Sequence, residues 1–325
     1  MMSKKIMMLF KNRPAAAILA AIALSACSGG GSDNNLNLSS GSTANTTGVN
    51  AGLTAQQAAD KQSTAENSSA FRFTVPTRGN IVNGSGNVVG SSNLSSLTLS
   101  VNGKTYDLGT PNLAQNEAYL SPKLADFAKG YGTYSYTLER VMNNRDGETQ
   151  KGRYKLYNQP YSFVVGRFLD WKKTLSQNGT SSRTTEDSNR QYETEIYYGY
   201  GGIAPGRLPQ NTTYNYVGKA FDAESEGDLS YNIVFRTDNT GHGSGRITGI
   251  TTRGNIELKR GNITMNGDEA VISGQAVSSR GNNRNGIYEL GIYGPDAAEI
   301  AGTATFNDPT VNRLDRKVGF GGVKQ

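Results

Sequence analysis

Few side chains in this sequence could carry out catalysis or hold a metal. The chain has one histidine, His242, and one cysteine, Cys27. A Ser-His-Asp triad would need His242, and the adjacent Gly243-Ser244-Gly245 lacks the G-x-S-x-G spacing of a nucleophile elbow. Zinc sites need several cysteines and histidines, and no G-x-x-x-x-G-K-[ST] phosphate loop occurs in the sequence. We therefore predict that the chain is not an enzyme and has no catalytic residue, no bound metal and no cofactor of its own.

Four acidic residues lie close together between positions 222 and 228. A solvated hairpin turn is the simpler interpretation of Asp222, Glu224, Glu226 and Asp228. A calcium loop is the alternative, although their spacing does not match an EF-hand.

Cys27 lies where a lipid anchor would be attached. It follows Leu24-Ser25-Ala26, and this box resembles the bacterial lipobox, which implies cleavage before Cys27 and acylation of its thiol. Four basic residues and an apolar run over 14–24 precede it. That run is about half of the ~20 residues that span a bilayer, so residues 1–26 are predicted to be a signal peptide. We expect an exported protein that is attached to a membrane through Cys27.

The net charge of the chain gives no sign of a nucleic-acid partner. The leader carries four of the 33 basic residues, so the formal charge of +6 falls to about +2 without it. No basic run with interleaved aromatic residues occurs. After the cysteine, residues 28–68 are mostly Gly, Ser, Asn, Thr, Ala and Gln, which cannot bury enough apolar surface to fold. We assign residues 27–68 to the lipidated cysteine and a flexible tether.

Residues 211–325 are predicted to form an antiparallel β-barrel. Short alternating segments are separated by Gly, Asn and Asp, as hairpins require. Eight such strands can close into a small barrel filled by side chains. The predicted strands are Thr213–Phe221, Ser230–Thr237, Gly243–Ile250, Asn255–Lys259, Glu269–Val277, Gly286–Tyr293, Glu299–Phe306 and Lys317–Val323.

Residues 69–210 are predicted to form a separate, sandwich-like β subdomain, so the whole fold is all-β. One short helix is expected after Ser121 and Pro122, with Leu124 and Phe127 on one face. Two segments, 170–189 and 197–210, show no regular pattern and are expected to be long loops. The predicted strands are Phe71–Val75, Leu97–Val101, Tyr134–Val141, Tyr154–Tyr157 and Tyr161–Phe168.

Two stretches of the barrel region resemble a known group of proteins. Residues 241–249 (GHGSGRITG) and 291–302 (GIYGPDAAEIAG) are similar to strands of the C-terminal barrels in surface lipoproteins of the transferrin-binding protein B and factor H binding protein type. The resemblance covers roughly 213–325. It implies a lipid-anchored protein on the surface of the outer membrane that binds a host protein.

Length then favours one family within this group. Transferrin-binding protein B has two lobes, and this chain has room for one. It is most similar in size and layout to the haemoglobin–haptoglobin utilisation lipoprotein (HpuA) family. That resemblance implies capture of host haemoglobin beside a TonB-dependent outer-membrane haem receptor, in haem-iron acquisition and virulence. Binding of factor H or transferrin on the same scaffold, and a structural lipoprotein or adhesin without a single ligand, remain the alternatives.

Direct haem binding is a further alternative. A single histidine excludes bis-histidine ligation, whereas tyrosine can ligate haem iron and the chain has 17 tyrosines. Tyrosine in β proteins more often serves packing and interfaces. We therefore expect the chain to hold the haem-carrying protein and not haem itself.

Three predicted loops carry the aromatic and basic residues that favour protein interfaces. They lie at 118–131, at 168–171 with the only tryptophan, and at 197–207. The alternative is that Trp171 and Tyr198 are ordinary core residues. The candidate protein-binding residues are Tyr119, Leu120, Phe168, Trp171, Tyr197, Tyr198, Tyr200, Ile203 and Arg207.

Overall fold

The alternating segments at the end of the chain close into a barrel in the computed structural model. The structure describes residues 53–82, 88–143, 146–178, 181–187, 197–281, 284–306 and 317–325. Cys27, the leader and most of the predicted tether lie outside these residues. Residues 51–325 belong to one compact unit.

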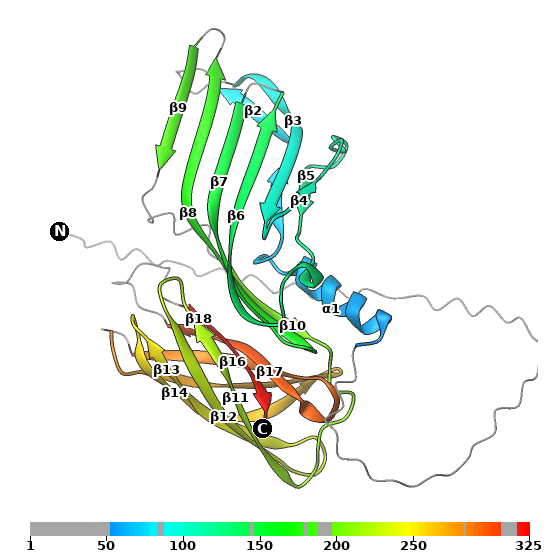
Figure 1. Ribbon diagram of the computed structural model, residues 1–325, viewed down its shortest axis with the longest axis vertical. Helices are drawn as coiled ribbons and strands as arrows, with labels where there is room; N and C mark the ends of the chain where they lie inside the picture. The colour runs from blue at the N-terminus through cyan, green and yellow to red at the C-terminus, as the bar shows by residue number, and fades with distance from the viewer. Residues whose placement is uncertain are drawn as a thin grey trace, which may run out of the picture. The chain divides into compact units, whose positions relative to one another are not determined.

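The predicted eight-stranded antiparallel barrel is confirmed (Figure 1). Each strand pairs with the next in the sequence, and the last pairs with the first. The predicted strand positions agree with the observed ones to within a few residues, apart from the fourth strand, which is eight residues longer than predicted. The strands are β11 (Thr212–Phe221), β12 (Glu226–Phe235), β13 (Gly241–Ile250), β14 (Gly254–Asn266), β15 (Glu269–Ser278), β16 (Asn285–Tyr293), β17 (Glu299–Phe306) and β18 (Lys317–Lys324).

Two tyrosines inside the barrel explain the glycines of the 241–249 stretch. The hydroxyls of Tyr231 and Tyr288 lie 2.9 Å apart, and Tyr288 also donates to the carbonyl of Lys259. A Cβ atom added at Gly243 would lie 2.5 Å from the Tyr231 ring, and one at Gly245 would lie equally close. The two neighbouring inward positions 243 and 245 of β13 are therefore glycines, because a large buried ring occupies the space beside them.

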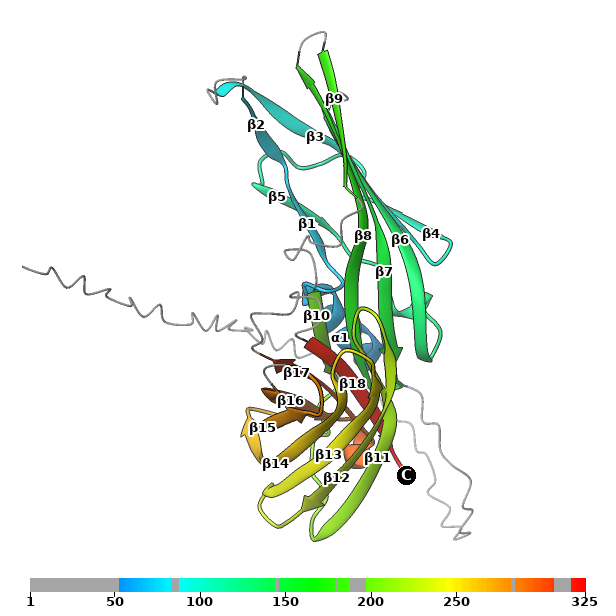
Figure 2. The same ribbon diagram turned by 90° about the vertical axis from the view of Figure 1, so that its left-hand side faces the viewer.

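The N-terminal region forms an open sheet rather than two equal layers of a sandwich. The strand order is β10-β8-β7-β6-β3-β2, with β4 paired to β3 and β9 paired to β8. A separate pair, β1 with β5, packs on one face of this sheet through shared core residues (Figure 2). The strands are β1 (Phe73–Pro76), β2 (Arg78–Val82), β3 (Val88–Val101), β4 (Lys104–Asp107), β5 (Glu117–Leu120), β6 (Gly130–Met142), β7 (Asp146–Asn158), β8 (Ser162–Asn178), β9 (Ser181–Asp187) and β10 (Tyr197–Gly202).

The helix lies in a different place from the one predicted. Residues 55–67, which we assigned to the tether, form α1, and a capping box between Thr54 and Gln57 begins it. Its side chains Lys61 and Ala65 are buried against the sheet region. A small-residue helix can pack here because β10 presents glycines, and a Cβ atom at Gly201 would lie 2.5 Å from Thr64.

The prediction of a helix after Ser121 is wrong. Only the three residues Leu124–Asp126 form a helical turn, of the 3-10 type. Leu124 and Phe127 are buried as expected. Phe127, however, is already extended (φ −108°, ψ 141°) because β6 starts three residues later, and one isolated turn cannot repay the cost of helix nucleation.

The segment 170–189 is a strand hairpin in its described part and not a loop. β8 continues to Asn178 and pairs with β9. The register between β7 and β8 shifts at Lys151/Gly152, where Asp170 is the extra residue of a β-bulge. The bulge breaks the two-residue alternation, which is why the sequence pattern did not predict this continuation.

A buried carboxylate joins the sheet to the barrel. Glu299, at the start of β17, is 2 % exposed. It accepts hydrogen bonds from the backbone N–H of Tyr161, in the β7–β8 connection, and from the hydroxyl of Ser162, the first residue of β8. The amide of Gln159 donates to the carbonyl of Ile300 over 3.1 Å. Burial raises the pKa of Glu299, and the hydrogen bonds from Ser162 and Tyr161 and the charge of Lys61 oppose this shift.

Apolar packing supports the same joint. Val164 and Phe168 of β8 form a cluster with Phe221, Ala223, Tyr293 and Ala301 of the barrel region. A Cβ atom at Gly294 would lie 2.7 Å from the Tyr161 ring, so this glycine lets the β7–β8 connection approach the barrel. Sheet and barrel therefore share one interface, with a polar centre and an apolar side.

Loss of the Glu299 carboxylate should destabilise the protein. In Glu299→Ala the N–H of Tyr161 and the hydroxyl of Ser162 lose their acceptor in a buried setting, so we expect the free energy of unfolding to fall by about 3 kcal/mol. Urea denaturation measures the change. Glu257→Ala, which removes an exposed carboxylate paired with Lys259, is the control and should cost less than about 1 kcal/mol. An equal loss of unfolding free energy in the two variants would contradict the stabilising role of Glu299.

A buried lysine under α1 should make stability depend on pH. The ammonium of Lys61 donates to Asn158 and to the carbonyl of Gln159. Burial and the nearby charge of Lys129 lower its pKa from 10.5 to about 7. Between these values the unfolded chain binds more protons than the folded chain, so this group raises the free energy of unfolding as pH increases.

We therefore expect Lys61→Gln to lose stability relative to the unmodified chain as pH rises above 7. The difference should change by up to about 1.4 kcal/mol per pH unit, measured by urea denaturation at pH 7 and pH 9. Gln62→Ala alters the same helix without changing its charge, and its effect should be the same at both pH values. A pH-independent effect of Lys61→Gln would refute this assignment.

Candidate binding surface

The tyrosines of β10 point alternately to the two faces of the sheet. Tyr197 packs against the core of the N-terminal sheet, and the guanidinium of Arg167 lies 4.4 Å from its ring centroid. Tyr198 and Tyr200 pack on the opposite side, against the cluster that joins sheet and barrel. The predicted loop at 197–202 is thus an edge strand with period-two alternation.

Tyr198 and Tyr200 both contact the barrel. Tyr198 stacks on Phe221 with ring centroids 6.2 Å apart, and its hydroxyl donates to the carbonyl of Lys317 over 2.9 Å. The Tyr200 hydroxyl donates to the carboxylate of Glu289 on β16, and burial raises the pKa of Tyr200. Both side chains are half-buried and contact the barrel, and a binding role for Tyr198 and Tyr200 stays a prediction.

The predicted binding role of Leu120 and Phe168 is corrected. Phe168 is 1 % exposed, within the joint, and Leu120 is 9 % exposed, within the core under β1 and β5. Leu120 faces the sheet core and Phe168 faces the barrel, so neither side chain is exposed to a partner. Sequence reasoning treated both as loop residues because it did not assign β5 and ended β8 at Phe168.

Two further candidate residues follow β10, one in contact with the barrel and one exposed. Ile203 is half-buried, its N–H donates to the carbonyl of Tyr161, and its carbonyl accepts from the N–H of Gly294. It therefore bridges the β7–β8 connection and the barrel. Arg207 is exposed and stays a candidate.

Trp171 lies on the outer face of the sheet with a basic neighbour. Lys151 of β7 is its cross-strand partner, with the ammonium 5.1 Å from the tryptophan ring centroid. Lys151 and Arg153 alternate with the buried Gly152 and so face away from the core. The guanidinium of Arg153 makes two hydrogen bonds of 2.9 Å to Asp170, and this pair raises the pKa of Arg153.

We call Lys151, Arg153, Asp170 and Trp171 the tryptophan patch. A half-exposed tryptophan beside fixed basic side chains has the composition of interface hot spots, and the strands of a sheet hold it in place. The bulge at Asp170 turns Trp171 outward, since without the extra residue it would occupy the inward phase. The sequence analysis found Trp171 but missed Lys151 and Arg153, which only the β7–β8 register brings next to it.

A second exposed aromatic pair lies on the β1–β5 side. Tyr119 is 50 % exposed, and the guanidinium of Arg72 lies 3.5 Å above its ring centroid. Stacking of this kind holds both side chains in one orientation. Tyr119 therefore stays a candidate binding residue, and Arg72 joins it.

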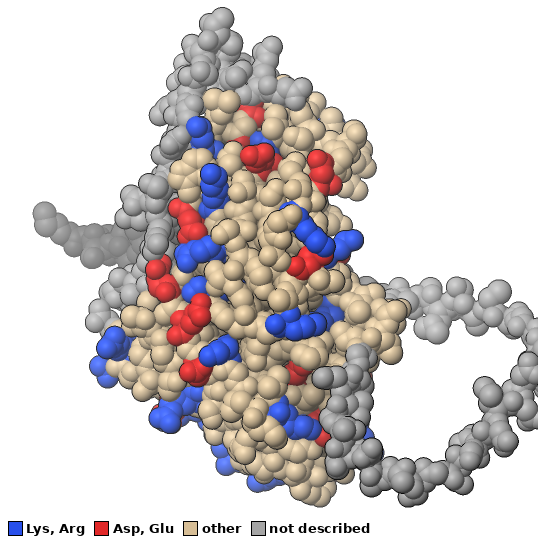
Figure 3. Space-filling model, viewed as in Figure 1, with Lys and Arg blue, Asp and Glu red and all other residues tan. Residues whose placement is uncertain are grey.

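Charge is mixed on the face that Figure 3 shows. Basic and acidic side chains are interspersed over the described part of this face. A partner would therefore be selected by local contacts more than by a long-range field.

The acidic group at 222–228 is a structural turn. Asp222 is fully buried and accepts hydrogen bonds from the backbone N–H groups of Glu224 and Ser225 and from the hydroxyl of Thr252. Within the described residues no three His, Cys, Asp or Glu side chains group in a way that could hold a metal ion. The same residues include no helix with the length and apolarity to cross a membrane.

The barrel region matches the model of a known protein family. Residues 206–304 match the family model for the C-terminal domain of factor H binding protein. The match spans β11 to β16 and most of β17. It supports the expected similarity of the barrel to the group that includes factor H binding protein, whereas the narrower similarity to the HpuA family stays a prediction.

One solved structure is similar over a larger part of the chain. It is a mutant of the vaccine antigen transferrin binding protein B (TbpB) from Haemophilus parasuis Hp5, at 14% sequence identity and a TM-score of 0.31. The similarity covers 76% of this chain and 51% of that chain. This chain thus aligns with about half the length of that protein.

The two kinds of aromatic residue should respond differently to truncation. Tyr198→Ala removes a ring from the joint and leaves a cavity, so we expect the free energy of unfolding to fall by about 3 kcal/mol. Trp171→Ala should cost no more than about 1 kcal/mol, because its ring lies at the surface. Urea denaturation compares them, and a larger loss for Trp171→Ala than for Tyr198→Ala would show that the two roles are reversed.

Proposed function

We propose that this chain is a surface lipoprotein that binds a folded host protein and does not change it chemically. The observation that carries the proposal is the match of residues 206–304 to the C-terminal domain of factor H binding protein, over strands that close into a barrel. By its name that family binds a host protein. The same reasoning makes the chain a binding protein and not an enzyme.

The N-terminal sheet is the part of the chain that we propose makes the contact. The tryptophan patch and the Arg72–Tyr119 pair combine exposed rings with basic side chains held by neighbouring strands. Such residues contribute a large share of binding energy when a partner covers them. The barrel, in this proposal, is the rigid base that orients the sheet.

Haemoglobin, free or bound to haptoglobin, is the partner we propose first, with delivery to a TonB-dependent outer-membrane haem receptor. The layout that the sequence predicts, one β subdomain followed by one barrel, favours this candidate, because it resembles that of haemoglobin–haptoglobin utilisation lipoproteins. Anchoring through the acylated Cys27 would place the sheet outside the cell. Haem would then be bound only within the captured partner.

Factor H is the second candidate, and the name of the matching family favours it. The two candidates are separated by offering both partners at once. Immobilised residues 53–325, which include α1, are incubated with serum and with lysed erythrocytes, and bound proteins are identified by mass spectrometry. Haemoglobin enrichment supports the first candidate and factor H the second, whereas no specific host protein from either source contradicts the proposal.

Truncation of the tryptophan patch should weaken binding of the captured protein. We expect Trp171→Ala to raise the dissociation constant about 30-fold, because interface tryptophans contribute ~2 kcal/mol or more. Lys151→Ala should have a smaller effect in the same direction. Ile287→Ala, which removes a 70 % exposed side chain from the barrel, is the matched control. Surface plasmon resonance measures all three, and unchanged binding by Trp171→Ala would exclude the patch.

A further inference from the structure

A small basic pocket of about 280 Å³ lies on the outer face of the barrel, where β12, β13 and β14 run side by side (Figure 1). Among the described residues that line it, the titratable side chains are Arg236, His242 and Arg260. The other lining residues are Thr240, Gly241, Asn262 and Ile263. No carboxylate is part of this described lining, so the pocket carries positive charge.

Strand pairing places the only histidine of the chain at the centre of the pocket. His242 lies opposite Asn262 on β14, and the next residue, Gly243, is buried inside the barrel. Because side chains alternate along a strand, the imidazole points outward. Burial and the nearby charges of Arg260 and Arg236 lower the pKa of His242. The imidazole is therefore mostly neutral at pH 7 and has one N–H to donate.

Two arginines reach the same pocket from the neighbouring strands. On β14, Lys259 and Arg260 together lie opposite the single residue Ser244, in a β-bulge. Both are exposed, whereas strict alternation would bury one of them. Arg236 follows the last residue of β12, and its N–H donates to the carbonyl of Thr240 over 2.9 Å, which closes the hairpin to β13. The bulge and the hairpin thus fix the backbone that carries each arginine.

Neither arginine forms an ion pair with a carboxylate in the part of the chain that the structure describes. Glu257, on the same strand as Arg260, pairs with Lys259 at 2.6 Å. Asp238, in the turn after Arg236, is not among the lining residues. Two like charges at one pocket repel each other, and solvent screens this repulsion only in part. An anion with two negative charges would neutralise the pair.

The size and charge of the pocket favour a phosphate monoester. The volume lies below the roughly 300–1,000 Å³ of most small-molecule sites, so the pocket can hold one charged headgroup and not an extended ligand. A phosphate monoester carries about two negative charges at neutral pH, and its three terminal oxygens can accept from two guanidinium groups and one imidazole. A carboxylate or a sulfate monoester carries one charge and would leave one arginine uncompensated.

We propose that this pocket binds a phosphate monoester, with its terminal oxygens at Arg236, Arg260 and His242. The ester belongs either to a soluble small molecule or to the headgroup of a membrane lipid. The proposal goes beyond host-protein binding and does not depend on it, because all three residues belong to the barrel and none to the N-terminal sheet.

The single histidine makes the test direct, because one imidazole signal in the NMR spectrum belongs to His242. This signal of residues 53–325 is followed through a pH titration with glucose 6-phosphate, with its singly charged counterpart glucose 6-sulfate, or with glucose, at matched ionic strength. A bound dianion favours the protonated imidazole, so we expect glucose 6-phosphate to raise the pKa of His242. Glucose 6-sulfate should raise it less, and glucose should not change it. No change with the phosphate, or equal changes with phosphate and sulfate, would overturn the proposal.

Variants assign the binding to this pocket. Arg236→Gln and Arg260→Gln should each raise the dissociation constant of glucose 6-phosphate about tenfold at pH 7.5, through loss of a charge-assisted hydrogen bond. Arg246→Gln, four residues from His242 on β13, makes the same change of charge outside the pocket and should leave the constant unchanged. All three arginines are exposed, so the substitutions do not alter the core. Chemical shifts of the His242 signal give the constants, and equal constants for the three variants would refute the assignment to this pocket.

Vesicles identify the source of the phosphate. Residues 53–325 are mixed with phosphatidylcholine vesicles that contain either phosphatidic acid, a phosphate monoester, or phosphatidylglycerol, a singly charged diester. Cosedimentation with phosphatidic acid alone, lost in Arg260→Gln, would support the proposal with a membrane lipid as the ligand. Binding of glucose 6-phosphate without cosedimentation would support it with a soluble ester. Equal cosedimentation with both lipids would show attraction by charge alone and would contradict the proposal.

Discussion

The contact between Glu299 and the β7–β8 connection is the constraint on which the rest of the structure depends. It holds the start of β8 against the barrel, and β8 then runs on for seventeen residues to Asn178. The first half of that strand packs on the barrel through Phe168, and the second half carries Trp171 and Lys172. Because a paired strand is stiff, whatever fixes its start also fixes the side chains near its end. The tryptophan patch is therefore positioned by an interface that contains none of its residues.

Contacts in this interface also explain several residues of the stretch 291–302. Gly294 leaves room for the ring of Tyr161, Glu299 accepts hydrogen bonds from the β7–β8 connection, and the carbonyl of Ile300 accepts one from Gln159. The residues that make the stretch similar to known surface lipoproteins are thus the barrel's half of the joint. Such a stretch identifies the scaffold and not the partner.

The barrel could be predicted from the sequence because several of its strands keep one buried and one wet face. Tyr231, Ile233 and Phe235 of β12 are buried and alternate with more exposed residues, and the glycine-containing turns mark the ends. The N-terminal sheet was predicted less well, since the bulge at Asp170 interrupts the alternation and both faces of β8 are buried up to that point. Of the candidate site, exposed aromatic residues could be named from the sequence, but Tyr198 and Trp171 are alike there. Both lie on the same face of the sheet, and only the structure shows that Tyr198 contacts the barrel, whereas Trp171 lies beside Lys151.

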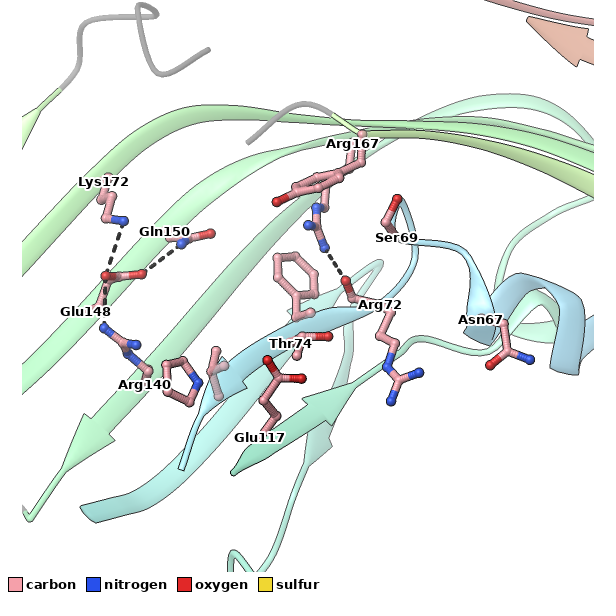
Figure 4. A pocket seen from close by; sticks show the side chains of 14 residues that line it. Asn67, Ser69, Arg72, Thr74, Glu117, Arg140, Glu148, Gln150, Arg167 and Lys172 are labelled. Carbon is pink, nitrogen blue, oxygen red and sulfur yellow. Dashed lines mark hydrogen bonds and ion pairs between the residues drawn. The ribbon is translucent and has the colours of Figure 1, made fainter. Parts of the chain in front are cut away.

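A cavity lined by Arg72, Arg140, Arg167 and Lys172 (Figure 4) shows the same limit, because these cations come from two strands and a connecting segment with no common motif. A buried guanidinium is recognisable only once the rings of Phe73 and Tyr197 are placed around it. The proposed role of the barrel as a rigid base requires that sheet and barrel move as one body. Residual dipolar couplings of backbone amides test this most directly, with separate alignment tensors fitted to β3–β8 and to β11–β18. We predict that the two tensors agree within error. Tensors that differ in magnitude or orientation would mean that the sheet moves independently, and the account would be wrong.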